Sequence, residues 1–152
     1  SFTSEYCPEW NIGISHNNLP VEKITTEAQN GNNAVKIAGD ANGRCDLRQV
    51  VSGIEAGKTY VVSFWYKANT KTASSSGIRI WSSFTKGGTS LSATGAVWAS
   101  ALQPTATYEV VTGWTKYEVE VVAPSDADGF NFEIRATKSN YGTIDNCSLV
   151  MK

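Results

Sequence analysis

The sequence predicts an all-β protein built as a two-sheet sandwich, and we favour a jelly roll as its specific form. Residue usage is the first reason: the 152 residues hold nine Ile and thirteen Val against five Leu, with fifteen Thr, sixteen Ser and thirteen Gly. β-Branched side chains pack well on a pleated surface, whereas helical domains rely on Leu, Ala, Glu and Lys. The second reason is a series of short alternating segments, separated by turn residues, without a helical period.

The N-terminal half contains a short strand and a predicted hairpin. Val35 and Ile37 mark the short strand. Residues 46–68 place two strand patterns around a turn at 55–58, which predicts an antiparallel hairpin. Alternation divides the second of these strands into an apolar face and a mixed face. The apolar face holds Tyr60, Val62, Phe64 and Tyr66, and the mixed face holds Val61, Ser63, Trp65 and Lys67.

The middle of the chain shows one more segment with an apolar face and a mixed face, followed by a stretch without alternation. After a serine-rich loop, residues 78–82 alternate, with two isoleucines on one face and Arg79 and Trp81 on the opposite one. Residues 85–107 are rich in Gly, Ser, Thr and Ala without sustained alternation. We interpret them as a long loop or an irregular edge that carries Trp98.

Three further strands are predicted in the C-terminal third. Residues 114–122 alternate cleanly, with both glutamates outward, and the strand ends before Pro124. A second strand covers residues 130–135, and a last one covers 143–151. In the second strand, Phe130, Phe132 and Ile134 face one way and Asn131, Glu133 and Arg135 face the other.

Length and composition indicate one domain spanning residues 1–152. The chain is 41% hydrophobic and has a net charge of -1, which excludes the basic footprint of an electrostatic nucleic-acid binder and favours an uncharged partner. No apolar run approaches the roughly 20 residues that cross a bilayer, and the first residues do not resemble a signal peptide. We therefore expect a soluble monomer without membrane contact, from which any export signal has been removed.

The sequence lacks the residues of common catalytic sites. It contains a single histidine, His16, in a polar stretch, and no nucleophile elbow, phosphate loop or dinucleotide fingerprint. Glu118 and Glu120 are the obvious carboxylate pair for glycoside hydrolysis, but they occupy the solvent side of an alternating strand. The predicted function is therefore binding and not catalysis.

Three cysteines, Cys7, Cys45 and Cys147, form no CxxC pair, so zinc is disfavoured. They fit either one disulfide with a free thiol or three buried thiols. Cys45 and Cys147 share the parity of Leu47 and Leu149, which favours buried thiols for these two.

Five tryptophans exceed what a sandwich core normally needs. An indole can cover the apolar face of a sugar ring while polar side chains bond the hydroxyl rim. Trp65 and Trp81 are placed for that role, and Trp98 either caps a groove or fills a small satellite cluster. Trp10 and Trp114 begin predicted strands, so we expect them to be structural. The alternative is that a loop covers some of these rings, because alternation does not say which face is core.

Four segments occur in a familiar order: GNNAVKI, LRQVVSGIEAGKTYVVSFWYKA, GWTKYEVEVVAP and GTIDNCSLV. Together they resemble the carbohydrate-binding modules of the family 4 and 9 type, which are related to family 22, over roughly residues 2–151. The resemblance implies a galactose-binding-like jelly roll that binds xylan or β-glucan in a groove on its concave sheet without hydrolysing it. It also implies a covalently linked secreted glycoside hydrolase, such as a xylanase, and an extracellular or cell-surface location.

The resemblance further implies site residues and a structural calcium. The concave face would carry, beside Trp98, Trp65, Arg79, Trp81, Asn131, Glu133 and Arg135. Asp145 falls in the last-strand motif that supplies a calcium ligand, although Thr3 replaces the usual acidic residue after Phe2. Asn30, Gly31, Asn32 and Asn33 also offer oxygens. The alternative is that the Asp145 carboxylate accepts backbone hydrogen bonds at a sheet edge.

We therefore expect a non-catalytic module that binds β-1,4-linked plant polysaccharide, xylan ahead of β-glucan, with an affinity nearly independent of salt. A protein-interaction or adhesin-type sandwich domain of a cell-surface protein is the alternative.

Overall fold

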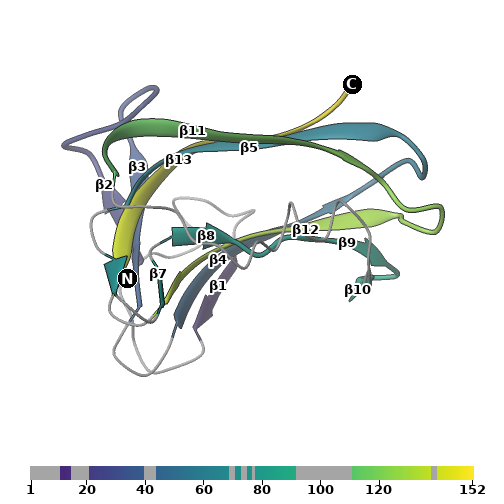
Figure 1. The fold of residues 1–152 in the computed structure, drawn as a ribbon, viewed down its shortest axis with the longest axis horizontal. Helices are drawn as coiled ribbons and strands as arrows, with labels where there is room; N and C mark the ends of the chain where they lie inside the picture. Colours follow the sequence, from purple (N-terminus) through teal and green to yellow (C-terminus); the bar gives the residue numbers. More distant parts are fainter. Residues whose placement is uncertain are drawn as a thin grey trace.

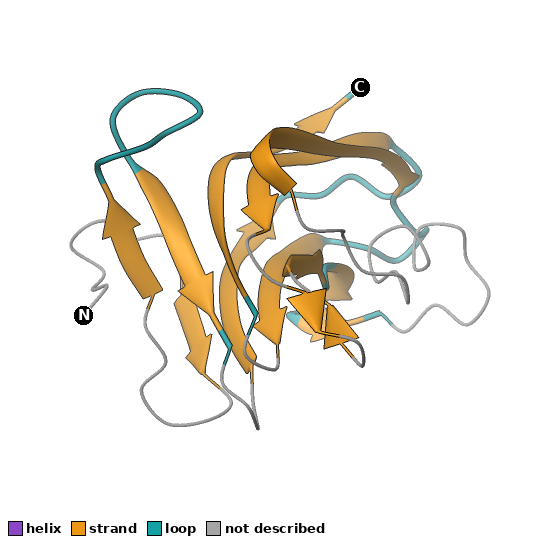
Figure 2. Cartoon of the chain, turned by 60° about the vertical axis from the view of Figure 1, so that its left-hand side comes forward, coloured by secondary structure: helices purple, strands orange, loops and turns teal. Residues whose placement is uncertain are grey.

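The computed structural model describes residues 11–14, 21–39, 44–68, 71–72, 75–76, 78–91, 111–137 and 140–152. All regular structure in these ranges is β-strand, and Figure 2 shows strands and loops without a helix. Within the same ranges there is consequently no long apolar helix of the kind that crosses a membrane. The predicted all-β class is confirmed.

Two antiparallel sheets lie face to face (Figure 1). The six-stranded sheet has the order β1-β4-β12-β9-β10, with β8 also paired to β12. Its strands are β1 (Asn11–Ile14), β4 (Arg44–Ser52), β8 (Ile78–Ile80), β9 (Ser83–Lys86), β10 (Thr89–Ser90) and β12 (Gly129–Thr137). The five-stranded sheet has the order β11-β5-β13-β3-β2. Its strands are β2 (Val21–Ile24), β3 (Ala34–Ala38), β5 (Thr59–Ala68), β11 (Val111–Val122) and β13 (Tyr141–Met151). A separate pair joins β6 (Lys71–Thr72) to β7 (Ser75–Ser76).

The core fills the space between the two sheets. In β5, Tyr60, Val62, Phe64 and Tyr66 are buried, as alternation predicted, and in β12 the same holds for Phe130, Phe132 and Ile134. The Phe64 ring lies 5.2 Å from the Tyr117 ring and 6.5 Å from the Phe132 ring, so it joins strands of both sheets. Side chains of opposite parity therefore point away from the core, onto the outer face of each sheet.

The predicted hairpin at residues 46–68 is wrong. Strand β4 belongs to the six-stranded sheet and β5 to the five-stranded sheet, so the turn between them carries the chain from one layer to the other. The backbone N–H groups of Gly53 and Ile54 both donate to the Asp128 carbonyl, and Gly57 donates to Ala123. The backbone N–H groups of this connection thus find their acceptors in the turn at residues 123–128, far along the chain. Alternation within one strand contains no information about such partners.

The loop predicted from residue 85 begins later than expected. Strands β9 and β10 pair across Gly87 and Gly88, whose φ angles are 53° and 79°. A two-residue turn with two positive φ angles matches the twist of a β-hairpin, which explains the glycine pair. The Asp128 carboxylate also accepts a hydrogen bond from the Gly87 N–H at 2.9 Å. The remainder of the predicted loop, with Trp98, lies outside the described residues.

Two of the cysteines are defined in the structure. Cys45 is fully buried in the core and Cys147 is half-buried, and neither belongs to a disulfide. The disulfide alternative is therefore excluded for these two, while Cys7 lies outside the described residues. Burial first, and then the neighbouring Asp46 charge, raise the pKa of the Cys45 thiol to about 11.

We expect the two thiols to react at different rates with a thiol reagent at pH 8. A shift of the pKa from 9.0 to about 11 lowers the thiolate fraction of Cys45 at pH 8 by roughly 100-fold. Since the thiolate is the nucleophile, Cys45 should react correspondingly more slowly. Mass spectrometry after brief labelling of the native protein should find Cys147 modified and Cys45 unmodified until denaturant is added. Equal labelling of both under native conditions would contradict this placement of Cys45.

Candidate functional site

The outer face of the six-stranded sheet gathers most of the polar residues that the sequence singled out. Arg79 lies on β8, Trp81 follows it, and Asn131, Glu133 and Arg135 alternate along β12. Residue pairs Ile80–Ile134 and Ser83–Asn131 keep one register, so β8 and β9 continue each other and Trp81 lies across from Glu133. The Trp81 N–H donates to the Glu133 carbonyl at 2.8 Å, which confirms this position.

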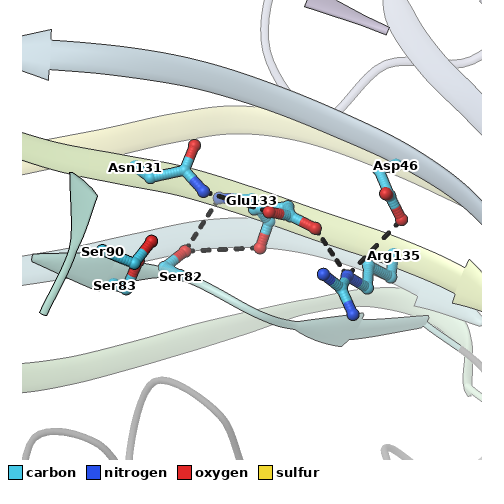
Figure 3. A network of polar contacts seen from close by, with 7 residues as sticks. All are labelled: Asp46, Ser82, Ser83, Ser90, Asn131, Glu133 and Arg135. Carbon is cyan, nitrogen blue, oxygen red and sulfur yellow. Dashed lines mark hydrogen bonds and ion pairs between the residues drawn. The ribbon is translucent and has the colours of Figure 1, made fainter. Parts of the chain in front are cut away.

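The Glu133 carboxylate is held from both sides by its neighbours on the same strand (Figure 3). Arg135 Nε donates to Glu133 Oε1 at 2.5 Å, and Asn131 Nδ2 donates to Oε2 at 3.0 Å. The Glu133 backbone N–H donates to Ser82 Oγ at 2.9 Å. With side chain and backbone both bonded, Glu133 has a defined orientation on a rigid strand.

Arg135 also faces a second carboxylate, which sequence reasoning missed. Asp46 pairs with Arg135 in the register of β4 and β12, and Arg135 Nε lies 3.4 Å from Asp46 Oδ1. Asp46, Glu133 and Arg135 are only 3%, 4% and 9% exposed. Arg135 is hydrogen-bonded to Glu133 and paired by charge with Asp46, and buried charges depend on such partners, so these three residues form one mutually dependent network. The sequence did contain a signal for Asp46: it lies between Cys45 and Leu47, which face the core, so its side chain must face outward.

Trp81 packs against the arginines of this network. The guanidinium carbons of Arg79 and Arg135 lie 4.8 Å and 4.4 Å from the centre of the Trp81 ring. These distances are those of cation–π contacts, which favour a defined ring position. The half-buried indole therefore sits beside polar groups whose own positions are constrained.

Trp65 does not share this face, contrary to the prediction. It lies on β5 in the five-stranded sheet, between Lys116 of β11 and Asp145 of β13, on the opposite outer surface of the sandwich. Alternation identified Trp65 as outward but could not say which sheet its strand joins. Trp114 lies on β11 of the same sheet, with Lys67 Nζ 5.0 Å from its ring centre. Trp10 and Trp98 lie outside the described residues.

Asp145 binds backbone N–H groups in the structure. Its Oδ2 accepts hydrogen bonds from the N–H groups of Gln29 at 2.8 Å and Asn30 at 3.0 Å, and its Oδ1 accepts one from Asn146 at 2.7 Å. Three backbone donors thus point their hydrogens at the carboxylate and fix its orientation. The described residues also contain no cluster of three or more His, Cys, Asp or Glu side chains suited to a metal ion. Asp145 as placed matches the alternative of a backbone acceptor.

Replacing Asp145 with alanine should lower the free energy of unfolding by about 1–2 kcal/mol, because the loop at residues 29–30 loses its link to β13. Urea denaturation measures the loss, and Asp145→Asn should lose less because it keeps one acceptor oxygen. We expect the same values with calcium and with a chelator. A stabilisation by calcium in the parent chain that disappears in Asp145→Ala would instead establish the metal site.

The other carboxylate pair has ordinary surface contacts. Glu118 pairs with Lys116, and Glu120 pairs with Lys152 at 2.7 Å, and all four side chains are well exposed. Such pairs contribute little to stability and keep a long edge strand soluble.

Comparison with known proteins defines the family. The family model described as "Carbohydrate binding domain" (CBM_4_9) matches residues 1–140 of the chain. Among curated proteins, no sequence is significantly similar to it.

Solved structures resemble the chain at low sequence identity. One is the enzymatically active domain of tailspike protein 4 from Bacteriophage CBA120, with a TM-score of 0.75, 12% identity, and coverage of 95% of this chain and 19% of that chain. Another is the CBM22-1 xylan-binding domain of Paenibacillus barcinonensis Xyn10C, with a TM-score of 0.57, 11% identity, and coverage of 95% and 86%. A third contains the CBM22-1-GH10 modules of the Clostridium thermocellum endo-1,4-β-D-xylanase 10B complexed with xylohexaose, with a TM-score of 0.61, 13% identity, and coverage of 95% and 26%. The chain thus spans about a fifth and a quarter of the first and third structures, and these likenesses establish the sandwich fold.

Proposed function

This chain belongs to the carbohydrate binding domain family, and from that premise we propose that it binds a β-1,4-linked plant polysaccharide, xylan ahead of β-glucan. It is a non-catalytic module, as members of this family are. The similarity in fold to a xylan-binding domain and to a xylanase module complexed with xylohexaose supports the choice of xylan.

One observation carries the proposal: an indole and a set of oriented polar groups lie together on the outer face of the six-stranded sheet. Trp81 lies across from Glu133, whose carboxylate is bonded to the Asn131 amide at 3.0 Å. A sugar ring presents an apolar face of C–H groups and a rim of hydroxyls, so one aromatic ring and several fixed polar groups form a complementary surface. Because the groups are held by the protein beforehand, little conformational freedom is lost on binding.

The module is proposed to act as an attachment for a covalently linked glycoside hydrolase outside the cell or at its surface. The module in the xylanase structure is joined to a GH10 module in that protein. Tethering raises the effective concentration of substrate around an enzyme without any new catalytic contact. We propose that the chain acts as a monomer, since one polysaccharide chain on one sheet face needs no second copy.

Native gel electrophoresis tests this function directly. The chain is run in gels that contain xylan, β-glucan, mannan or no polysaccharide, beside a reference protein that binds none of them. We expect retardation by xylan, weaker retardation by β-glucan and none by mannan. Unchanged mobility in all gels would reject the proposal and favour a domain that binds other proteins.

A further inference from the structure

The arginines of this chain are confined to one sheet, whereas four ion-paired lysines lie at the other and Lys86, in β9 of the six-stranded sheet, pairs with Asp128. All four arginines lie in the six-stranded sheet, at positions 44 and 48 in β4, 79 in β8 and 135 in β12. Four lysines at the five-stranded sheet are each paired with a glutamate. These pairs are Lys36–Glu22, Lys67–Glu27, Lys116–Glu118 and Lys152–Glu120. The charges of these four lysines are thus offset by carboxylates close to them.

The described side chains on the outer face of β4, β8 and β12 include more positive than negative groups. The positive groups are those of Arg48, Arg79 and Arg135, and the negative groups are those of Asp46 and Glu133. Arg135 is buried and lies close to both carboxylates, at 2.5 Å from Glu133 Oε1 and 3.4 Å from Asp46 Oδ1. Arg135 thus contacts both acidic groups of the face, and Arg48 adds an exposed positive charge beside them.

Arg48 is the exposed member of this set. It lies directly across from Glu133 in the register of β4 and β12. Among the described contacts, however, no ion pair joins the two residues, because the Glu133 oxygens accept from Arg135 and Asn131 instead. Arg48 is exposed, as is Val50 two residues further along β4, at 62%. It is available to a ligand from solvent.

Arg48 and Trp81 lie in one row across the sheet, with Glu133 between them. Since adjacent strands are about 4.8 Å apart, their backbones are separated by roughly 10 Å. This separation matches the reach of a sugar ring that is stacked on the indole and carries a side group pointing toward Arg48. A guanidinium presents two parallel N–H donors that match the two oxygens of a carboxylate, a geometry that lysine does not offer.

We propose that this face selects a polysaccharide whose backbone carries uronic acid side groups, with Arg48 binding the carboxylate. The inference rests on the proposed function and names the substrate class at the same site. The Glu133 charge does not prevent it, because Arg135 and Asn131 already hold that carboxylate. The contacts between Trp81 and the sugar backbone would be the same for a neutral polysaccharide. The carboxylate of the side group therefore supplies the discrimination between acidic and neutral polysaccharides.

A pair of ligands that differ in one group provides the test. Glucuronoxylan and the same preparation after chemical reduction of its carboxyl groups are titrated calorimetrically into the chain at low and at high salt. We expect reduction of the carboxyl groups to weaken binding about tenfold, the ratio that corresponds to one charge-assisted hydrogen-bonding group. High salt should remove much of this difference, because the site is exposed.

Variants assign the effect to Arg48. Arg48→Gln should bind both preparations with the affinity that the parent chain has for the reduced one, and Arg48→Lys should recover part of the preference. Lys116→Gln is the matched control, since it removes one positive charge on the opposite outer face and should behave as the parent chain. Arg48 is exposed, so the melting temperature should not change.

The outcomes separate this inference from the proposed function. Equal affinity of the parent chain for both preparations overturns the uronic acid preference and leaves xylan binding intact. A loss in Arg48→Gln that is as large for the reduced preparation also overturns it, because Arg48 would then bind hydroxyls. Failure to bind either preparation rejects the proposed function itself.

Discussion

Replacing Arg135 with methionine should lower the free energy of unfolding by about 3–5 kcal/mol, the largest effect expected on the outer faces of this sandwich. The guanidinium is the shared partner of Glu133 and Asp46, whose carboxylates are 4% and 3% exposed. Without it, two charges would remain buried beside each other and without their cation. Methionine keeps much of the aliphatic volume, so chemical denaturation reports mainly the loss of charge.

A compensated variant distinguishes the charge effect from the loss of packing. Combining Arg135→Met with Glu133→Gln and Asp46→Asn removes all three charges, and we expect it to recover more than half of the lost stability. Arg135→Lys, which keeps the charge without the planar fork, should fall between the parent chain and Arg135→Met. If Arg135→Met costs less than about 1 kcal/mol, the three residues do not form the mutually dependent network described above.

Replacing Trp81 with alanine should weaken xylan binding by about 30-fold, or about 2 kcal/mol. The indole is the described aromatic ring on the outer face of the six-stranded sheet, and it is held against the guanidinium groups of Arg79 and Arg135. Removing the ring takes away both the stacking surface and the element that orients these arginines. Trp81→Phe keeps a smaller ring and should lose less. Calorimetric titration of xylan into each variant measures the effect, with melting curves to establish that the variants fold.

Trp65→Ala is the matched control for this experiment. Trp65 is also half-buried and outward, but on the five-stranded sheet. We expect xylan affinity within about twofold of the parent chain, because the two tryptophans lie on opposite outer surfaces. Loss of binding in Trp65→Ala with full binding in Trp81→Ala would move the site to the five-stranded sheet and contradict the assignment made here.

Most strands could be predicted from the sequence because their evidence is local. The apolar alternation of β5 and β12 marks Phe64 and Phe132 as inward, and both are buried in the structure. The hairpin at residues 46–68 was wrong because the same alternation occurs whether two strands pair with each other or belong to facing sheets. The glycine pair at 87–88 was read as part of a loop, although its two positive φ angles form a tight turn between β9 and β10.

The candidate site was predictable in part for the same reason. Glu133 and Arg135 share a face because they are two residues apart on one strand, which the sequence states directly. Asp46 is 89 residues earlier than Arg135 in the chain and meets it only through the register of β4 and β12. No local pattern connects the two residues, so the second carboxylate of the network was missed.

The sequence by itself determined the all-β class, the inward and outward side chains of the main strands and the family. The class and the two faces follow from residue usage and from a period of two along each strand, and the family follows from the resemblance of four segments; all of these are local properties of the sequence. Only the tertiary structure decided that Trp65 and Trp81 lie on opposite surfaces, that Arg135 joins Asp46 to Glu133, and that Arg48 stands exposed beside them. The physical reason is that sheet membership and register are set by hydrogen bonds and packing between strands far apart in the chain, to which alternation within one strand is indifferent.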